Sequence, residues 1–75
     1  NMPELILKYN LPEEREDADI VLNAQNFFSI IWDTKQKLRE KLKYENLKEE
    51  EYKAYEEMSE FFHGLLSDNN VSNLF

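Results

Sequence analysis

The sequence has no cysteine, only one glycine and a single histidine among its 75 residues. The absence of cysteine excludes disulfide bonds within this chain and thiolate metal sites, and His63 has no second His or Cys at ligand spacing. With so little glycine there is no glycine-rich phosphate-binding loop, and a domain of this size has little room for a pocket. We therefore expect no metal, no cofactor and no enzymatic activity.

Long apolar runs are missing as well. No segment is long enough to span a membrane and no signal-peptide pattern is present, so we expect a soluble, cytoplasmic protein. Asn1 precedes Met2 and is interpreted as a residue left over from expression. Residues 2–75 are predicted to form one small domain, in which a single core supplies only about 3–5 kcal/mol of stability. Help from a second subunit is therefore expected.

The longest helical periodicity runs through residues 23–44. Apolar residues recur there at spacings of three, four and seven, which places them on one stripe of a helix. Pro12 and the two glutamates after it predict an earlier helix that ends near Asn23. A third helix is predicted from about residue 48 to 66, and the short connection makes the last two helices an antiparallel hairpin. The predicted fold is mainly α.

A short β-strand is predicted before these helices. Residues 4–9 have branched and aromatic side chains in rough alternation, with Leu5 and Leu7 on one face. A lone strand leaves its backbone groups unpaired, so it must pair with the tail at residues 71–75 or with its own copy in a second chain. We favour the homodimer, with Leu5, Leu7 and Trp32 as candidate dimer contacts.

The net charge of −7 is unevenly distributed along the chain. Residues 1–33 carry seven acids and two bases, residues 34–43 one acid and five bases, and residues 44–75 eight acids and two bases. Nucleic acid and anionic lipid would repel such a chain, whereas a basic protein surface would attract it over a Debye length of about 8 Å. We expect no direct binding to nucleic acid or to a membrane.

The acids gather in two clusters, on the first and third predicted helices. One interpretation is a solvated surface, because the helix dipole favours acids near a helix start. Pairs with lysine at i,i+4 contribute only about 0.2–0.5 kcal/mol, so helix stability does not require this many acids. The alternative is that they imitate the phosphates of duplex DNA, which carries about one charge per 1.7 Å. The candidate partner-binding acids are Glu13, Glu14, Glu16, Asp17, Asp19, Glu49, Glu50, Glu51, Glu56, Glu57 and Glu60.

The basic run from Lys35 to Lys43 occupies the second half of the predicted central helix. Intrahelical ion pairs can form between Asp33 and Lys37 and between Glu40 and Lys43, and cations are favoured near a helix C-terminus. No aromatic stacking motif supports recognition of RNA or DNA. We interpret the run as structural, with a DNA-binding transcription regulator as the alternative.

Residues 67–75 are expected to form a flexible or short extended tail. Peptides that dock on bacterial sliding clamps typically carry a glutamine, then a leucine, and end in Leu-Phe or a similar apolar pair. Leu74 and Phe75 match that ending, whereas Asn70 would have to replace the glutamine. Leu74 and Phe75 are therefore candidate residues for a clamp pocket.

Several short motifs resemble those of small phage-encoded proteins. They are mainly helix-boundary and packing residues spread over most of the chain: Leu11-Pro12-Glu13-Glu14, Leu22-Asn23-Ala24, Trp32-Asp33, Leu38-Arg39, Lys43-Tyr44 and Glu49-Glu50-Glu51. In length, acidity and asparagine content the chain is similar to the staphylococcal phage family of host-takeover proteins that inhibits the bacterial DNA sliding clamp. That resemblance implies an acidic homodimer in the host bacterial cytoplasm that occupies the basic DNA channel of the clamp.

The functional hypothesis is a DNA-mimicking inhibitor of a host DNA-replication protein. The favoured target is the sliding clamp, whose loading onto DNA it would block. One alternative is an anti-restriction or anti-CRISPR DNA mimic. Another is a small phage adaptor that docks on its partner through a helix face or through the Leu74-Phe75 tail.

Overall fold

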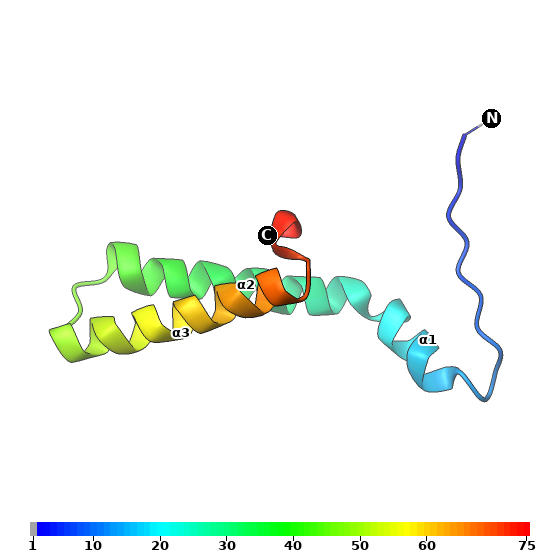
Figure 1. Cartoon of the computed structure of the whole chain (residues 1–75), viewed down its shortest axis with the longest axis horizontal. Helices are drawn as coiled ribbons and strands as arrows, with labels where there is room; N and C mark the ends of the chain where they lie inside the picture. The colour runs from blue at the N-terminus through cyan, green and yellow to red at the C-terminus, as the bar shows by residue number, and fades with distance from the viewer. Residues whose placement is uncertain (1) are drawn as a thin grey trace.

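The computed structural model describes residues 2–75 and is mainly helical, which confirms the predicted class. The elements are α1 (Arg15–Leu22), α2 (Ala24–Tyr44), α3 (Glu49–Asp68) and a short 3₁₀ helix, η1 (Ser72–Leu74). The molecule is elongated, with principal extents of 52, 33 and 19 Å (Figure 1). Asn1, interpreted above as an expression remnant, lies outside the described residues.

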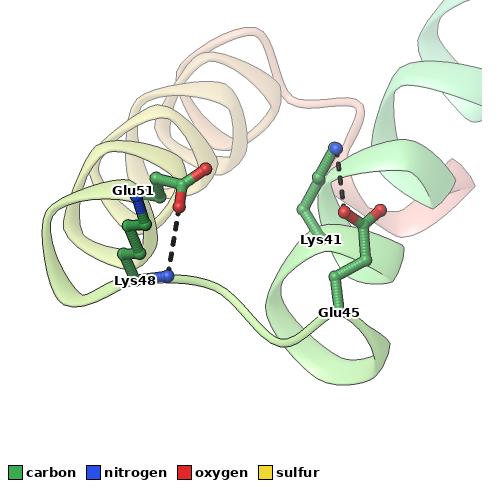
Figure 2. Close-up of polar contacts among 4 residues, drawn as sticks. All are labelled: Lys41, Glu45, Lys48 and Glu51. Atoms are coloured by element: carbon green, nitrogen blue, oxygen red, sulfur yellow. Dashed lines mark hydrogen bonds and ion pairs between the residues drawn. The ribbon is translucent and has the colours of Figure 1, made fainter.

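Helices α2 and α3 lie side by side as an antiparallel hairpin (Figure 1). The start of α3 is held by Glu51, whose carboxylate accepts a hydrogen bond from the backbone N–H of Lys48 at 3.2 Å (Figure 2). This is one half of a capping box, and a lysine side chain has no acceptor with which to supply the other half. Across the loop, Lys41 Nζ donates a hydrogen bond to the Glu45 carboxylate at 2.9 Å (Figure 2).

Helix α1 is shorter than predicted and begins at Arg15. Residues 11–14 form a turn instead, in which the Glu14 N–H donates to the Asn10 carbonyl at 2.8 Å. The Glu14 carboxylate accepts a hydrogen bond from the Asn10 N–H at 3.0 Å and so closes the turn from the other side. The local hydrogen bonds of the turn thus replace the first helical turn that the proline pattern predicts.

The junction between α1 and α2 is a single residue, Asn23. Its side-chain amide donates to the Asp19 carbonyl at 2.8 Å, and the same carbonyl accepts the Asn23 backbone N–H at 3.1 Å, so Asn23 closes the end of α1. No residue of α1 is buried. Its position therefore depends mainly on its direct continuation into α2.

The predicted N-terminal strand at residues 4–9 is wrong, because residues 2–10 have no regular secondary structure. The chain is drawn out there, but within residues 2–75 no other segment forms a strand beside it (Figure 1). Without a neighbouring strand no ladder forms, and the backbone N–H and C=O groups are left to water. Leu5 and Leu7 are 85% and 58% exposed, so neither joins a core within this chain.

Helix α3 ends at Asp68 in a Schellman motif that the sequence pattern did not reveal. Asn70 takes a positive φ of 60°, the conformation that lets the chain reverse after a helix. The Asn70 N–H donates to the Ser67 carbonyl, and the Val71 N–H donates to the Leu66 carbonyl, each at 3.0 Å. The reversal carries the last residues back toward α2.

The C-terminal residues consequently differ from the flexible or extended tail expected for residues 67–75. Residues 72–74 form η1, and the ring of Phe75 stacks on that of Phe28 with centroids 4.7 Å apart. Stacked aromatic pairs at this separation stabilise a fold by about 0.5–1.5 kcal/mol beyond the area they bury. The tail is therefore a packed part of the fold.

The hydrophobic core is small and lies along the seam between α2 and α3. Among residues 2–75, Leu66 is the only buried hydrophobic residue. The radius of gyration is 17.6 Å, compared with about 11 Å for a compact domain of this length. The accessible surface is 6877 Å², compared with about 4,900 Å² for a compact 9.1 kDa protein. The single chain therefore exposes about 2,000 Å² more surface than a compact monomer would.

Candidate interaction surfaces

The first candidate surface is a row of carboxylates on α3. At 100° per residue, five of its six N-terminal acids fall within an arc of about 120°, on the side of the helix away from the buried Leu66. Glu51 lies outside the arc and caps the helix instead. The five exposed residues of the arc, called here the α3 acidic row, are Glu49, Glu50, Glu56, Glu57 and Glu60.

Few carboxylates of this segment have a cationic partner. Lys53 Nζ lies 3.4 Å from the Glu49 carboxylate, and both side chains are largely exposed. Residues 49–60 span about 17 Å of helix axis and carry six acids and one lysine. This gives one net negative charge per about 3.3 Å, close to the value of about 3.4 Å for one strand of DNA.

The acids near α1 form a separate cluster. Glu13, Glu14, Glu16, Asp17 and Asp19 lie on and just before α1, at the opposite end of the molecule from the start of α3 (Figure 1). Two of them have local partners: Arg15 Nε lies 3.6 Å from the Asp19 carboxylate, and Glu14 binds the Asn10 N–H. A single chain therefore does not bring the two predicted acidic clusters onto one surface.

An apolar groove is formed where α1, α2 and the C-terminal segment meet. Its volume is about 270 Å³, and apolar side chains make up its lining. The lining residues are Ile20, Val21, Ala24, Phe27, Phe28, Ile31, Val71, Leu74 and Phe75. Phe27 and Leu74 are 45% and 56% exposed, so the groove is open to solvent. Of its residues, only Leu74 and Phe75 were predicted from the sequence as site residues.

Two other predicted contacts take different roles in the structure. Trp32, a candidate dimer contact, stacks beside Phe28 with ring centroids 6.3 Å apart and remains partly exposed. Phe75, a candidate clamp-pocket residue, also stacks on Phe28, with ring centroids 4.7 Å apart. A tail that docks as a free peptide would first have to break the stack between Phe28 and Phe75.

A basic cleft, which was not predicted from the sequence, runs between α2 and α3. Its volume is about 350 Å³, and its lining consists of Lys35, Leu38, Arg39, Leu42, Lys43, Ser59 and His63. The cations come from one edge of α2, whereas Ser59 and His63 come from α3. The expected intrahelical pairs between Asp33 and Lys37 and between Glu40 and Lys43 are absent from the ion pairs of residues 2–75. The sequence contains one indication of this cleft: Ser59 and His63 are four residues apart, which places both on the same side of α3.

Lys41 lies on the other edge of α2 and does not line this cleft. The carboxylate of Glu45, hydrogen-bonded to Lys41 Nζ, raises the pKa of this lysine above its ordinary value. Its ammonium group also lies 5.4 Å from the centroid of the Tyr55 ring, within the range of a cation–π contact. Within residues 2–75, Lys41 of the basic run is therefore paired with a carboxylate, whereas the cations that line the cleft are not.

Within the described part of the chain, no group of three or more acidic or histidine side chains is placed to hold a metal ion. None of the helices in residues 2–75 is long and apolar enough to cross a membrane. Comparison with protein-family models, with curated proteins and with solved structures gives no match.

Proposed function

We propose that this protein is a non-catalytic, DNA-mimicking inhibitor that binds the basic DNA-binding surface of a host replication protein. The observation that supports the proposal is the α3 acidic row, whose exposed carboxylates belong to a helical segment that averages one net negative charge per about 3.3 Å, near the value for one DNA strand. Proteins that bind DNA place Lys and Arg side chains along a groove to neutralise phosphates. Those cations would pair with the carboxylates of α3 instead.

The first target to test is the bacterial sliding clamp in the host cytoplasm. This choice rests on the resemblance to the staphylococcal phage family, which implies a protein that occupies the basic DNA channel of the clamp. Electrostatic attraction would speed the encounter, and desolvated apolar contacts would slow dissociation. With the channel occupied, the clamp could not be loaded onto DNA.

We further propose that the protein acts as a homodimer joined through the apolar groove. The chain exposes about 2,000 Å² more surface than a compact monomer, part of it in residues 2–10, so enough surface is available for a dimer interface of standard size, about 800 Å² per partner. The isolated 8-residue α1 is too short to be stable without packing, and a second copy would supply that packing. The start of α3 lies at the far end of the molecule, so both acidic rows would stay exposed (Figure 1).

The dimer is tested by sedimentation equilibrium over a range of protein concentrations. We expect a species of twice the 9.1 kDa chain mass. Phe27→Gln, which alters the groove at a partly exposed position, should shift the equilibrium toward monomer, and the helical circular dichroism signal should fall by no more than the contribution of the 8-residue α1. A wild-type protein that stays monomeric at high concentration would refute this part of the proposal.

The DNA-mimic mechanism is tested with purified clamp and two matched triple variants. E49Q/E50Q/E57Q removes three charges from the α3 acidic row and leaves the Glu51 cap in place. E16Q/D17N/D19N removes three charges near α1, so both variants change the net charge from −7 to −4. If each lost pair is worth about 0.5 kcal/mol, the α3 variant should bind about tenfold more weakly. Binding of the wild type should also weaken as salt is raised.

Three results would contradict this mechanism. The first is an unchanged affinity of the α3 variant, and the second is binding that does not respond to salt. The third is an equal loss in both triple variants, which would show that net charge matters and the position of the row does not. Circular dichroism of both variants verifies that the helices remain, because first-turn acids each stabilise a helix by about 0.3–1 kcal/mol.

The alternatives differ in partner or in surface. An anti-restriction or anti-CRISPR mimic would use the same acidic row, so capture from a bacterial lysate with a salt elution separates it from a clamp inhibitor by partner identity. The open apolar groove favours one further candidate, an adaptor that docks a host protein there. In that case Phe27→Gln would weaken partner binding in a protein whose mass is that of one chain.

A further inference from the structure

The basic cleft collects positive charge on a protein whose overall charge is strongly negative. Lys35, Arg39 and Lys43 follow one another at i,i+4 on α2, so their side chains project from the same edge at intervals of about 6 Å along the axis. Ser59 and His63 line the facing side of the cleft from α3, and leucine side chains complete the lining between them. Both walls are thus set by rigid helices.

The three cations have no carboxylate partner within the described residues. Like charges at i,i+4 destabilise a helix, so their spacing works against the stability of α2. Glu45, which follows the basic run, is bonded to Lys41 on the other edge of the helix. Glu56 precedes Ser59 by three residues on the same edge of α3, yet it does not line the cleft. The cleft therefore presents donors and positive charge to solvent.

We propose that this cleft is a binding site for an anion that carries a row of phosphate groups, such as a polyphosphate chain. A guanidinium group binds phosphate in a bidentate fashion, and lysine ammonium groups on either side of it add positive charge along the row. The Ser59 hydroxyl and the His63 imidazole can donate further hydrogen bonds from the opposite wall. The cleft volume of about 350 Å³ is within the range of small-molecule sites.

Two kinds of ligand carry such a row of phosphate groups: a free polyphosphate and the backbone of single-stranded nucleic acid. The free anion is favoured because the acidic row on the outer side of α3 repels a long polyanion that extends beyond the cleft. This inference does not depend on the proposed inhibition of a replication protein, since that function uses other residues.

Binding of an anion in the cleft can be followed by the fluorescence of Trp32, the only tryptophan of the sequence. Lys35 Nζ lies 5.7 Å from the centroid of the Trp32 ring, so an anion that draws Lys35 into the cleft should change the tryptophan emission. Inorganic tripolyphosphate is titrated into the 75-residue protein at low salt, in parallel with a short single-stranded oligonucleotide. We expect a saturable emission change with tripolyphosphate at a dissociation constant of about 1 mM or lower, and a weaker response per phosphate from the oligonucleotide.

Charge-removing variants locate the site. Arg39→Gln should weaken tripolyphosphate binding about fivefold, the value of one well-formed exposed ion pair. Lys37→Gln removes the same charge from a residue of α2 that does not line the cleft, and it should change affinity less than about twofold. Glu56→Gln should strengthen binding, because it removes a negative charge beside the cleft.

Two outcomes would overturn the proposal. One is the absence of a saturable change with tripolyphosphate, confirmed by chemical shifts of the Arg39 and Lys43 backbone amides in case Trp32 does not respond. The other is an equal weakening by Arg39→Gln and Lys37→Gln, which would indicate a diffuse charge effect. Preferential binding of the oligonucleotide would refute the free anion as the ligand and assign the cleft to nucleic acid.

Discussion

Replacing Leu66 with alanine should destabilise the hairpin more than any other single truncation of a leucine. Leu66 is 6% exposed, while its neighbour Leu65 is 45% exposed and belongs to the same helix. Truncation of a buried leucine costs about 2–5 kcal/mol, because the transfer free energy is lost and a cavity is left behind. In a domain whose core supplies only about 3–5 kcal/mol, Leu66→Ala is expected to leave a large unfolded population at 25 °C.

Leu65→Ala is the matched control for this prediction. Full burial of a leucine side chain is worth about 1.5–3 kcal/mol, so a side chain that is half exposed should lose about 1–1.5 kcal/mol, without a closed cavity. The two variants share composition, helix propensity and position along α3. The difference between their losses in free energy of unfolding therefore measures the effect of burial between the helices, and we expect it to be about 1–3 kcal/mol.

Urea unfolding, followed by circular dichroism at several protein concentrations, measures both values. If the core lies along the α2 and α3 seam, Leu66→Ala lowers the urea midpoint more than Leu65→Ala does. Equal losses at every concentration would refute the assignment of Leu66 as the core residue. A Leu65→Ala loss that grows with protein concentration would show that a second copy covers Leu65.

Two further predictions follow from the tail and the loop. Phe75→Ala removes the stack on Phe28, so it should lower the free energy of unfolding by about 1–3 kcal/mol, whereas Leu74→Ala, with more than half of its side chain exposed, should cost less in the same urea assay. Glu45 raises the pKa of Lys41 in the folded protein. The stabilisation from the Lys41–Glu45 pair is therefore fully present below the pKa of Lys41 in the unfolded chain, about 10.4, and is lost as the pH rises through the pKa of Lys41 in the folded protein. Glu45→Gln should therefore reduce the difference in stability between pH 9 and pH 12, whereas an unchanged difference would show that this pair does not contribute.

The helices could be predicted from the sequence because their signals are local. Apolar residues at spacings of three, four and seven mark α2, and the short connection to α3 requires an antiparallel hairpin. The end of α3 could not be predicted in the same way. Asn70 must adopt a left-handed conformation for the Schellman motif to close, and the asparagine-rich segment resembled a loose loop.

The prediction of an N-terminal strand was wrong for a related reason. Alternation of side chains indicates which conformation a segment favours, but a strand exists only if another strand pairs with it. Residues 71–75 were the only candidate partner in the chain, and they form η1 and the stack on Phe28. Alternation alone gave no information about this competing use of the tail.

The candidate surfaces were only partly predictable, since they depend on which edges of two helices face each other. The acids of α3 are evident from the sequence, and helical geometry alone places five of them in one arc. The basic cleft needs the register between α2 and α3, which brings Ser59 and His63 opposite Arg39. Composition therefore predicts an acidic protein but not where its positive charge becomes concentrated.

The two ends of the molecule differ in how much they depend on a partner. At one end, α1 and the apolar groove have too little packing within the chain, so their order should depend on what covers them. At the other end, the hairpin holds charged side chains on rigid helices and needs no partner to fix their spacing. If the groove joins two copies, association completes the weak core at the α1 end. The same association doubles the negative charge to −14 on one assembly, which strengthens attraction to a basic target. Stability and recognition would then be coupled, because a change that opens the groove also halves the charge that draws the protein to its partner.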